Sequence, residues 1–390
     1  MGRSQPSLGL APPSRRKDAR AKAARFTAHK TIPGLLASSA RVRKGVESSE
    51  LILDASAVDV RSSMRGLGSR GHGDDGRANV KIRVVADDTL VVARALSQAS
   101  AGGFGEEKSA RPKRNVAVLN MASPLVPGGG FLNGATAQEE SLCNRTTLYP
   151  ALKDEFYRLP EVGAIWTEDV LVFRDHTGQD LGKGDRWWVD VISAAMLRFP
   201  DVEDTTDEDK KYASQKDRDT AGRQIKCLMD ILQAKGVEKC VLGAWGCGAY
   251  GNPVMEIANA FNKVILGDGR DSKTKHWGNL KEIVFAIKEE RLAADFAKHF
   301  GNGLQVERLA LGQDHTSDEN EDAGTDELKD LEDKIKELGL RIGQSNNPSL
   351  KTPLEAIRAQ MMSQLEQKRS VNTPADVLSE ENSEDDDEST

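Results

Sequence analysis

The 390-residue sequence lacks several features that would define a membrane, secreted or metal-binding protein. It contains no run of eighteen apolar residues, so we expect no transmembrane helix. Its first residues include no apolar segment of the kind that directs secretion. Its six histidines are scattered, and none stands at metal-ligand spacing from a cysteine or a carboxylate. We therefore expect neither a membrane anchor nor a metal site.

Cysteine is scarce as well, and the few cysteines are not arranged as redox or metal motifs. They show no C-x-x-C spacing and lie in apolar or glycine-rich surroundings: Cys143, Cys227, Cys240 and Cys247. Such cysteines are typical of reduced thiols, which predicts a location in the cytoplasm or the nucleus. Apolar residues make up only 38% of the sequence, which predicts that part of the chain is disordered.

The net charge of −7 conceals opposite charges at the two ends of the chain. Residues 1–30 contain eight lysines or arginines and one acid, whereas residues 371–390 contain eight acids and no base. We predict a basic disordered arm over residues 1–32 and an acidic disordered tail over residues 371–390, both dispensable for chemistry. The arm is compatible with a solvated leader, a nuclear signal, a contact to a nucleic acid or a similar polymer, or a mitochondrial presequence.

Residues 128–140 form the most informative segment. They contain four glycines and end in two adjacent carboxylates, Glu139 and Glu140, at the start of a predicted helix. The preceding residues 116–120 are typical of a buried strand, which ends at Asn120. Glycine lets a backbone approach a bulky ligand, and two carboxylates, one kept protonated, serve the cleavage of glycosidic bonds. Acids in a first helical turn also favour the helix dipole, but their place after the glycines indicates an active site.

This segment and its surroundings resemble the microbial-type poly(ADP-ribose) glycohydrolases. That family is defined by a triple glycine, here Gly128, Gly129 and Gly130, followed by Gln-Glu-Glu, here residues 138–140. Further similar segments are residues 148–150, 170–175, 189–195 and 242–253. The similarity begins near Arg41 and ends near Glu289, so it covers roughly two thirds of the chain, the size of a full domain.

The resemblance implies a macrodomain-type, three-layer α/β/α sandwich with an N-terminal helical extension, which we place at residues 33–300. It implies hydrolysis of the ribose–ribose O-glycosidic bond of poly(ADP-ribose), with Glu140 as general acid and base and Glu139 holding the ribose. The substrate-binding residues expected from the motifs are Asn120, Gly128, Gly129, Gly130, Gln138, Gly246, Cys247, Gly248, Ala249 and Tyr250. No metal or redox cofactor is needed, and the expected partners are poly(ADP-ribose) and ADP-ribosylated proteins.

Two other functions fit parts of the sequence. An NAD-dependent oxidoreductase is suggested by residues 246–251, whose pattern G-x-G-x-x-G follows a predicted strand. NAD and ADP-ribose carry the same pyrophosphate, which backbone N–H groups at a helix N-terminus attract. The acid pair favours ADP-ribose, because hydride transfer has no use for it. A protein that binds ADP-ribose without turnover is the other alternative, and it would be expected to lack Glu140.

Apolar periodicity predicts strands that alternate with helices. We expect strands near residues 80–84, 116–119, 170–173, 187–192, 239–243 and 282–287. Helices are predicted over residues 89–98, capped by Asp88, and over residues 217–233. This alternation is typical of a mostly parallel sheet covered on both faces, with ligands at the carboxyl ends of the strands. Residues 61–78, rich in Gly, Arg and Asp, are typical of an exposed insertion.

From residue 301 the sequence changes, and we predict a helical extension over residues 301–370. Apolar residues there recur with a three-four spacing: Leu328, Leu331, Ile335, Leu338 and Ile342. A second helix is predicted to begin near Thr352. We favour a helical hairpin packed on the domain over a module for protein binding through residues 325–366. Nucleic acid is not expected to bind except through the basic arm.

Overall fold

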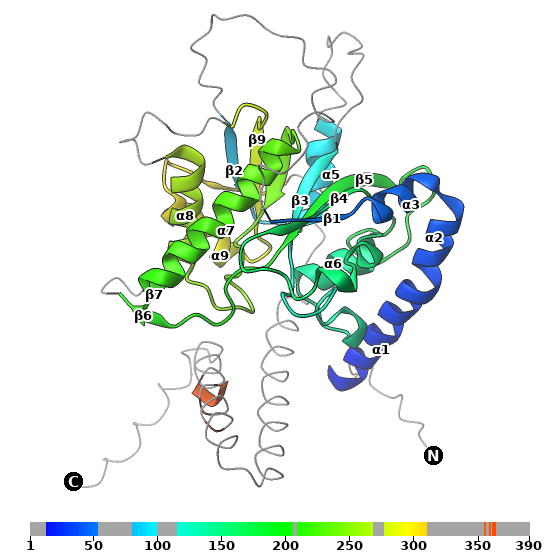
Figure 1. The fold of residues 1–390 in the computed structure, drawn as a ribbon, viewed down its shortest axis with the longest axis horizontal. Coiled ribbons are helices and arrows are strands. Elements are labelled where there is room, and N and C mark those ends of the chain that lie inside the picture. The colour runs from blue at the N-terminus through cyan, green and yellow to red at the C-terminus, as the bar shows by residue number, and fades with distance from the viewer. Residues whose placement is uncertain are drawn as a thin grey trace, which may run out of the picture. The chain divides into compact units, whose positions relative to one another are not determined.

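The computed structural model describes residues 13–53, 80–99, 115–205, 209–267 and 277–309, and the helical positions Glu355, Ala359 and 361–363. The chain divides into two compact units, Met1–Leu311 and Gly312–Thr390. The first unit contains the sheet and the candidate site (Figure 1). The predicted insertion at 61–78, the apolar residues at 328–342 and the acidic tail lie outside the described residues.

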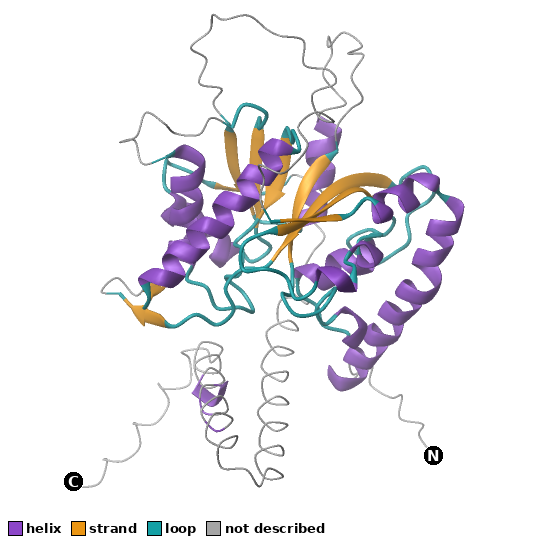
Figure 2. Ribbon diagram, in the orientation of Figure 1, coloured by secondary structure: helices purple, strands orange, loops and turns teal. Residues whose placement is uncertain are grey.

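The first unit is built on an eight-stranded sheet (Figure 2). The order across the sheet is β1-β4-β5-β3-β8-β9-β2-β10. Neighbours from β5 to β10 are parallel, whereas β4 pairs antiparallel with both β1 and β5. The strands are β1 Glu50–Ile52, β2 Lys81–Val85, β3 Val116–Met121, β4 Ala164–Val172, β5 Trp187–Ala194, β8 Lys239–Leu242, β9 Glu282–Ala286 and β10 Val306–Glu307. The strands expected from the sequence are therefore present, in a sheet that is mostly parallel.

Helices cover both faces of this sheet. The helices are α5 Thr89–Ala99, α6 Gln138–Arg145, α7 Gln215–Ala234, α8 Val254–Leu266 and α9 Glu290–Phe300. Side chains of α5 and α6 share one apolar cluster with the sheet, and those of α7, α8 and α9 share another. In β3, Val116 and Val118 point into the first cluster, whereas Ala117 and Leu119 point into the second. A strand buried on both faces is mostly apolar, and the predicted three-layer α/β/α sandwich is confirmed.

The N-terminal residues differ from the sequence prediction. Helix α1 spans Pro13–Phe26, a π-helical turn spans Thr27–Thr31, and α2 Ile32–Ser38 and α3 Ala40–Glu47 follow (Figure 1). The prediction of a disordered arm over residues 1–32 is therefore wrong for residues 13–32, although the helical extension after residue 32 is present. The reason is that this segment packs through small residues: Ala21 and Ala24 of α1 and Thr27 of the π-helical turn are buried. Small side chains add little apolar content, but they let a helix backbone approach its neighbour closely.

The C-terminal boundary also differs slightly. Strand β10 pairs with β2, so the sheet continues beyond residue 300, where the sequence placed the end of the domain. Of the predicted helical extension, Glu355, Ala359 and residues 361–363 are described, and they are helical. No helix in the described part of the chain is long and apolar enough to cross a membrane.

Candidate active site

The site begins where strand β3 loses one of its partners. Its pairing with β8 ends at Val118, which leaves backbone groups of the next residues without a strand to bond. The side chain of Gln138 takes the place of that strand: Met121 N donates to its Oε1 at 2.9 Å, and its Nε2 donates to Leu119 O at 2.7 Å. These bonds fix the first turn of α6 against the end of β3. The side chain of Gln138 therefore forms its hydrogen bonds with the backbone of β3.

Glu139 is buried and receives hydrogen bonds at both carboxyl oxygens. Asn120 Nδ2 donates to Oε1 at 3.3 Å, and Ser123 N donates to Oε2 at 2.7 Å. Asn120 is itself held by a 3.0 Å bond from Nδ2 to the hydroxyl of Ser193 on β5. The carboxyl group of Glu139 therefore ties the end of β3 to the loop that follows it.

Glu140 is buried as well, but its two oxygens differ. Gly130 N donates to Oε1 at 2.7 Å, whereas Oε2 has no hydrogen-bond partner among the described residues. Gly129 lies directly against both acids: a Cβ there would be 2.8 Å from Glu140 Oε1 and 2.9 Å from Glu139 Oε2. Its φ of +55° also favours glycine. The first glycine loop, residues 128–134, is thus packed onto the acid pair.

The electrostatics of the pair follow from its burial. Burial is the largest cause that raises the pKa of Glu139 to about 8; the charge of Glu140 adds to the rise, and hydrogen bonds from Ser123, Asn120 and Gly128 oppose it. Burial also raises the pKa of Glu140, against the opposing hydrogen bond from Gly130. Desolvation disfavours the charged form of a carboxyl group. The pair therefore retains protons at a pH where an exposed glutamate has lost its own.

The second glycine loop, residues 246–251, joins β8 to α8 and has a different character. Its turn is closed by bonds from Cys247 N to Ala244 O, from Gly251 N to Gly248 O, and from Asn252 N to Gly246 O. The N–H groups of Gly248, Ala249 and Tyr250 have no hydrogen-bond partner within the described residues. Consecutive unpaired N–H groups in a turn form a binding site for anions. The side chain of Cys247 packs against the apolar cluster, so only its backbone faces this turn.

Tyr250 connects the two loops. Its hydroxyl lies near Ser123, the residue whose N–H binds Glu139, and its pKa is raised mainly by burial. Its ring meets the ring of Phe199 at 63°, with centroids 6.3 Å apart. The residues predicted from both glycine motifs are therefore brought together at the carboxyl ends of β3 and β8.

Several buried polar atoms around the acid pair have no partner in the described structure: Asn120 Oδ1, Glu140 Oε2 and the hydroxyl of Tyr157. Buried polar groups are nearly always hydrogen-bonded, so such a group needs an explanation. Tyr157 lies close enough to Glu139 and Tyr250 for their charges to raise its pKa, after burial. No sequence pattern indicated Tyr157, because it lies in a loop that only the fold brings to the acids.

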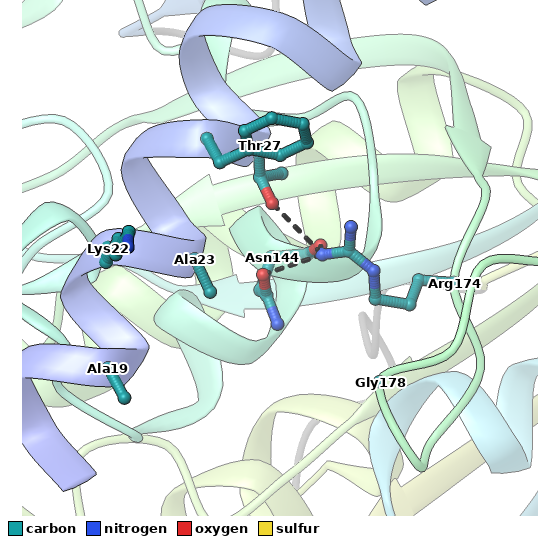
Figure 3. Close-up of a pocket in the computed structure, with 8 residues that line it drawn as sticks. Ala19, Lys22, Ala23, Thr27, Asn144, Arg174 and Gly178 are labelled. Atoms are coloured by element: carbon teal, nitrogen blue, oxygen red, sulfur yellow. Dashed lines mark hydrogen bonds between the residues drawn. The ribbon is translucent and has the colours of Figure 1, made fainter.

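Helix α1 packs against the end of the first glycine loop, at Gly134. Arg20 Nε donates to Gly134 O at 3.0 Å, and a side chain at Gly134 would collide with the backbone of Lys17 and Ala21. Arg174 binds the residue that follows the C-terminal end of α1. Its Nη1 donates to Thr27 Oγ1 at 3.1 Å and to Asn144 Oδ1 at 2.8 Å (Figure 3). These contacts explain why the basic arm is ordered in this region.

A cavity of about 460 Å³ lies between α1, the end of α6 and the loop after β4, and Figure 3 draws the side chains that line it. Its lining includes Ala19, Lys22, Phe26, Asn144 and Arg174. None of the residues around the acid pair lines it. The guanidinium group of Arg174 is bonded to Thr27, Asn144 and Asp180. We therefore regard this cavity as part of the attachment of α1.

Comparison with known proteins shows a similarity over the segment that contains the acid pair. Residues 53–175 match the family described as microbial-type PARG, catalytic domain, where PARG stands for poly(ADP-ribose) glycohydrolase. This segment contains the first glycine loop and the acid pair. No curated protein matches the chain significantly. The family resemblance found in the sequence is confirmed.

Solved structures are similar in fold. The PARG of Thermomonospora curvata is 24% identical with a TM-score of 0.52, and the match covers 73% of this chain and all (100%) of that one. The same enzyme bound to the inhibitor ADP-HPD is 22% identical with a TM-score of 0.51, at the same coverage of 73% and 100%. The PARG of Deinococcus radiodurans in complex with ADP-ribose is 23% identical with a TM-score of 0.48, covering 66% of this chain and 96% of that one.

Proposed function

We propose that this chain, which carries the microbial-type PARG catalytic domain over residues 53–175, hydrolyses the ribose–ribose O-glycosidic bonds of poly(ADP-ribose) and releases ADP-ribose. The observation that carries the proposal is the state of Glu140. Its Oε1 is fixed by Gly130 N, its Oε2 is buried without a partner, and burial raises its pKa. A general acid requires such a carboxyl group, protonated near neutral pH and held in one orientation.

In the proposed mechanism Glu140 acts twice. Its proton passes from Oε2 to the ribose oxygen that leaves, the glycosidic C–O bond breaks, and positive charge develops on the ring of the other ribose. The carboxylate that remains then accepts a proton from water, and the resulting hydroxide bonds to that anomeric carbon. Ordinary glycosidases use two carboxylates on opposite sides of the bond. Glu139 and Glu140 are adjacent in one helical turn and cannot flank the bond, so we assign both proton transfers to Glu140.

The other residues are proposed to hold the substrate and the acid. Glu139 and Asn120 would hold the ribose: Asn120 Nδ2 binds Glu139 Oε1, and Asn120 Oδ1 is buried without a partner among the described residues. Gly128, Gly129 and Gly130 let the backbone lie against the acids, while Gln138 positions α6. The row of N–H groups at Gly248, Ala249 and Tyr250 suits the two phosphates, with Gly246 and Cys247 shaping the turn.

The test uses pure protein and labelled poly(ADP-ribose). Glu140→Gln should lower kcat by about 10²–10⁴-fold, because general acid–base help is typically of this size, while ADP-ribose affinity measured by calorimetry is retained. Glu155→Gln, which changes an exposed glutamate outside the site, should match the wild-type protein. A wild-type chain that binds ADP-ribose and releases none from the polymer would instead be a binding protein without turnover.

Partners and location extend the proposal. We infer that the chain acts on poly(ADP-ribose) attached to proteins in the cytoplasm or the nucleus, on the evidence of its family and its reduced-type cysteines. A protein contact through residues 325–366 and a nucleic-acid contact through the basic arm stay predictions. Import into mitochondria is tested by locating a fluorescently tagged full chain in cells.

A further inference from the structure

An exposed aromatic residue stands beside the second glycine loop without a role in the core. Phe199 follows β5, and its backbone N–H donates to Tyr250 O at 3.0 Å. Its side chain is 44% exposed. Its φ is +53°, a region that bulky side chains rarely adopt. A strained aromatic residue that contributes little packing points to a role outside the fold.

A cation completes this surface. The guanidinium carbon of Arg198 lies 5.1 Å from the centre of the Phe199 ring and 6.0 Å from that of Tyr250. Both distances are within the range of cation–π attraction. Arg198 is exposed, and it forms no ion pair with another residue of the described ranges. The positive charge is therefore held over two rings and is available to an anion.

The position of this group matters as much as its chemistry. Tyr250 carries one of the three N–H groups of the second glycine loop that have no partner in the described part of the chain, and its hydroxyl lies near Ser123 beside Glu139. Arg198 and Phe199 therefore lie on the outer side of the residue that connects the anion-binding turn with the acid pair. A ligand that fills the proposed diphosphate site would pass next to them.

We propose that Arg198, Phe199 and Tyr250 form a subsite that stacks an adenine of the substrate, with Arg198 also facing a phosphate. The proposal rests on the function proposed above. Adenines are the only aromatic groups of poly(ADP-ribose), and bases stack on aromatic and arginine side chains. The adenine belongs either to the ADP-ribose unit that is released or to the unit that stays on the polymer. The chemistry of recognition is the same for both.

The experiment measures binding in the Glu140→Gln chain, so that polymer is not consumed. Phe199→Ala should weaken the binding of short poly(ADP-ribose) roughly 5- to 150-fold, the range expected for loss of one base–aromatic stack. Phe199→Gly should do the same without lowering Tm, since glycine accepts the positive φ. Phe199→Tyr should restore affinity. Phe26→Ala removes an exposed aromatic ring on α1 and should change nothing.

Two ligands separate the two sources of adenine. If the released unit supplies it, Phe199→Ala weakens binding of free ADP-ribose and of short polymer alike. If the neighbouring unit supplies it, ADP-ribose affinity stays within about twofold and only polymer binding weakens. Unchanged affinity for both ligands overturns the subsite. An equal loss of affinity for ribose 5-phosphate, which has no base, would also overturn the subsite. A wild-type chain that neither binds ADP-ribose nor cleaves polymer would overturn the proposed function itself.

Discussion

The two glycine loops of this domain use the same residue type for opposite purposes. In the first loop, residues 128–134, backbone N–H groups bind the acids, and a side chain at Gly129 would meet two carboxylates. In the second loop, residues 246–251, three consecutive N–H groups have no hydrogen-bond partner among the described residues, and a Cβ at Gly248 would meet none of their atoms within 4 Å. Gly129 therefore brings the backbone against the acids, whereas Gly248 leaves open space beside its turn.

The largest expected effect is in the first loop. Gly129→Ala should lower kcat by about 10²–10⁴-fold, as removal of the general acid would, because the new Cβ displaces the carboxyl groups. The φ of +55° adds strain. Steady-state kinetics on labelled polymer measures the loss, and circular dichroism checks the fold. Activity near that of the wild-type chain would show that the acids tolerate displacement.

Removal of α1 should also damage the first loop. A chain that begins at residue 33 lacks the support at Gly134 and the bond from Arg174 to Thr27. We expect loss of most activity and a lower Tm, contrary to the expectation from sequence that the whole arm is dispensable. Arg20→Ala is the milder variant, because it removes the side chain and keeps the helix. A truncated chain with full activity would separate α1 from the site.

The pKa of the acid pair predicts a pH dependence with a definite sign. The general acid must be protonated, so kcat should fall as the pH rises through the raised pKa of Glu140. Glu139 has a folded-state pKa of about 8, above its ordinary value of 4.5. Its contribution to stability is therefore complete below pH 4.5 and is lost as the pH rises toward 8. Glu139→Gln should flatten the Tm profile over that range; identical profiles would contradict this.

Tyr250 tests the connection between the loops. Tyr250→Ala should weaken ADP-ribose binding by about 1–3 kcal/mol, the size of a stacking contact. Tyr250→Phe keeps the ring, so the dissociation constant should stay near that of the wild-type chain. Calorimetry on both variants separates the ring from the hydroxyl. An unchanged dissociation constant for Tyr250→Ala would return this residue to a purely structural role.

The smallest effect is expected in the second loop. Gly248→Ala adds a methyl group in open space, at a position whose backbone angle is not reserved for glycine. ADP-ribose affinity should change by less than about 1 kcal/mol, and kcat should stay at the wild-type level. Comparing the kcat of this variant with that of Gly129→Ala shows how differently the two loops are packed. A loss as severe as that of Gly129→Ala would mean that the two loops are equally crowded.

The sequence by itself determined the parts that depend on local pattern. Mostly apolar runs marked β3, β5, β8 and β9, since strands covered on both faces are predominantly apolar. Asp88 was placed as the cap of α5, and its Oδ1 accepts from Leu90 N and Val91 N. The acid pair and both glycine motifs were visible because their chemistry needs those residue types at close spacing.

The tertiary structure decided which groups meet. Gln138 bonds to the backbone of β3 because the strand order leaves β3 without a partner at that point. Tyr157 and Phe199 reach the site from loops between strands, where no periodicity announces a contact. Helix α1 packs through alanines, which carry too little apolar surface to be recognised in a charged segment. Contacts between distant segments depend on the order of the strands and on how closely backbones approach. A local sequence pattern determines neither of these properties.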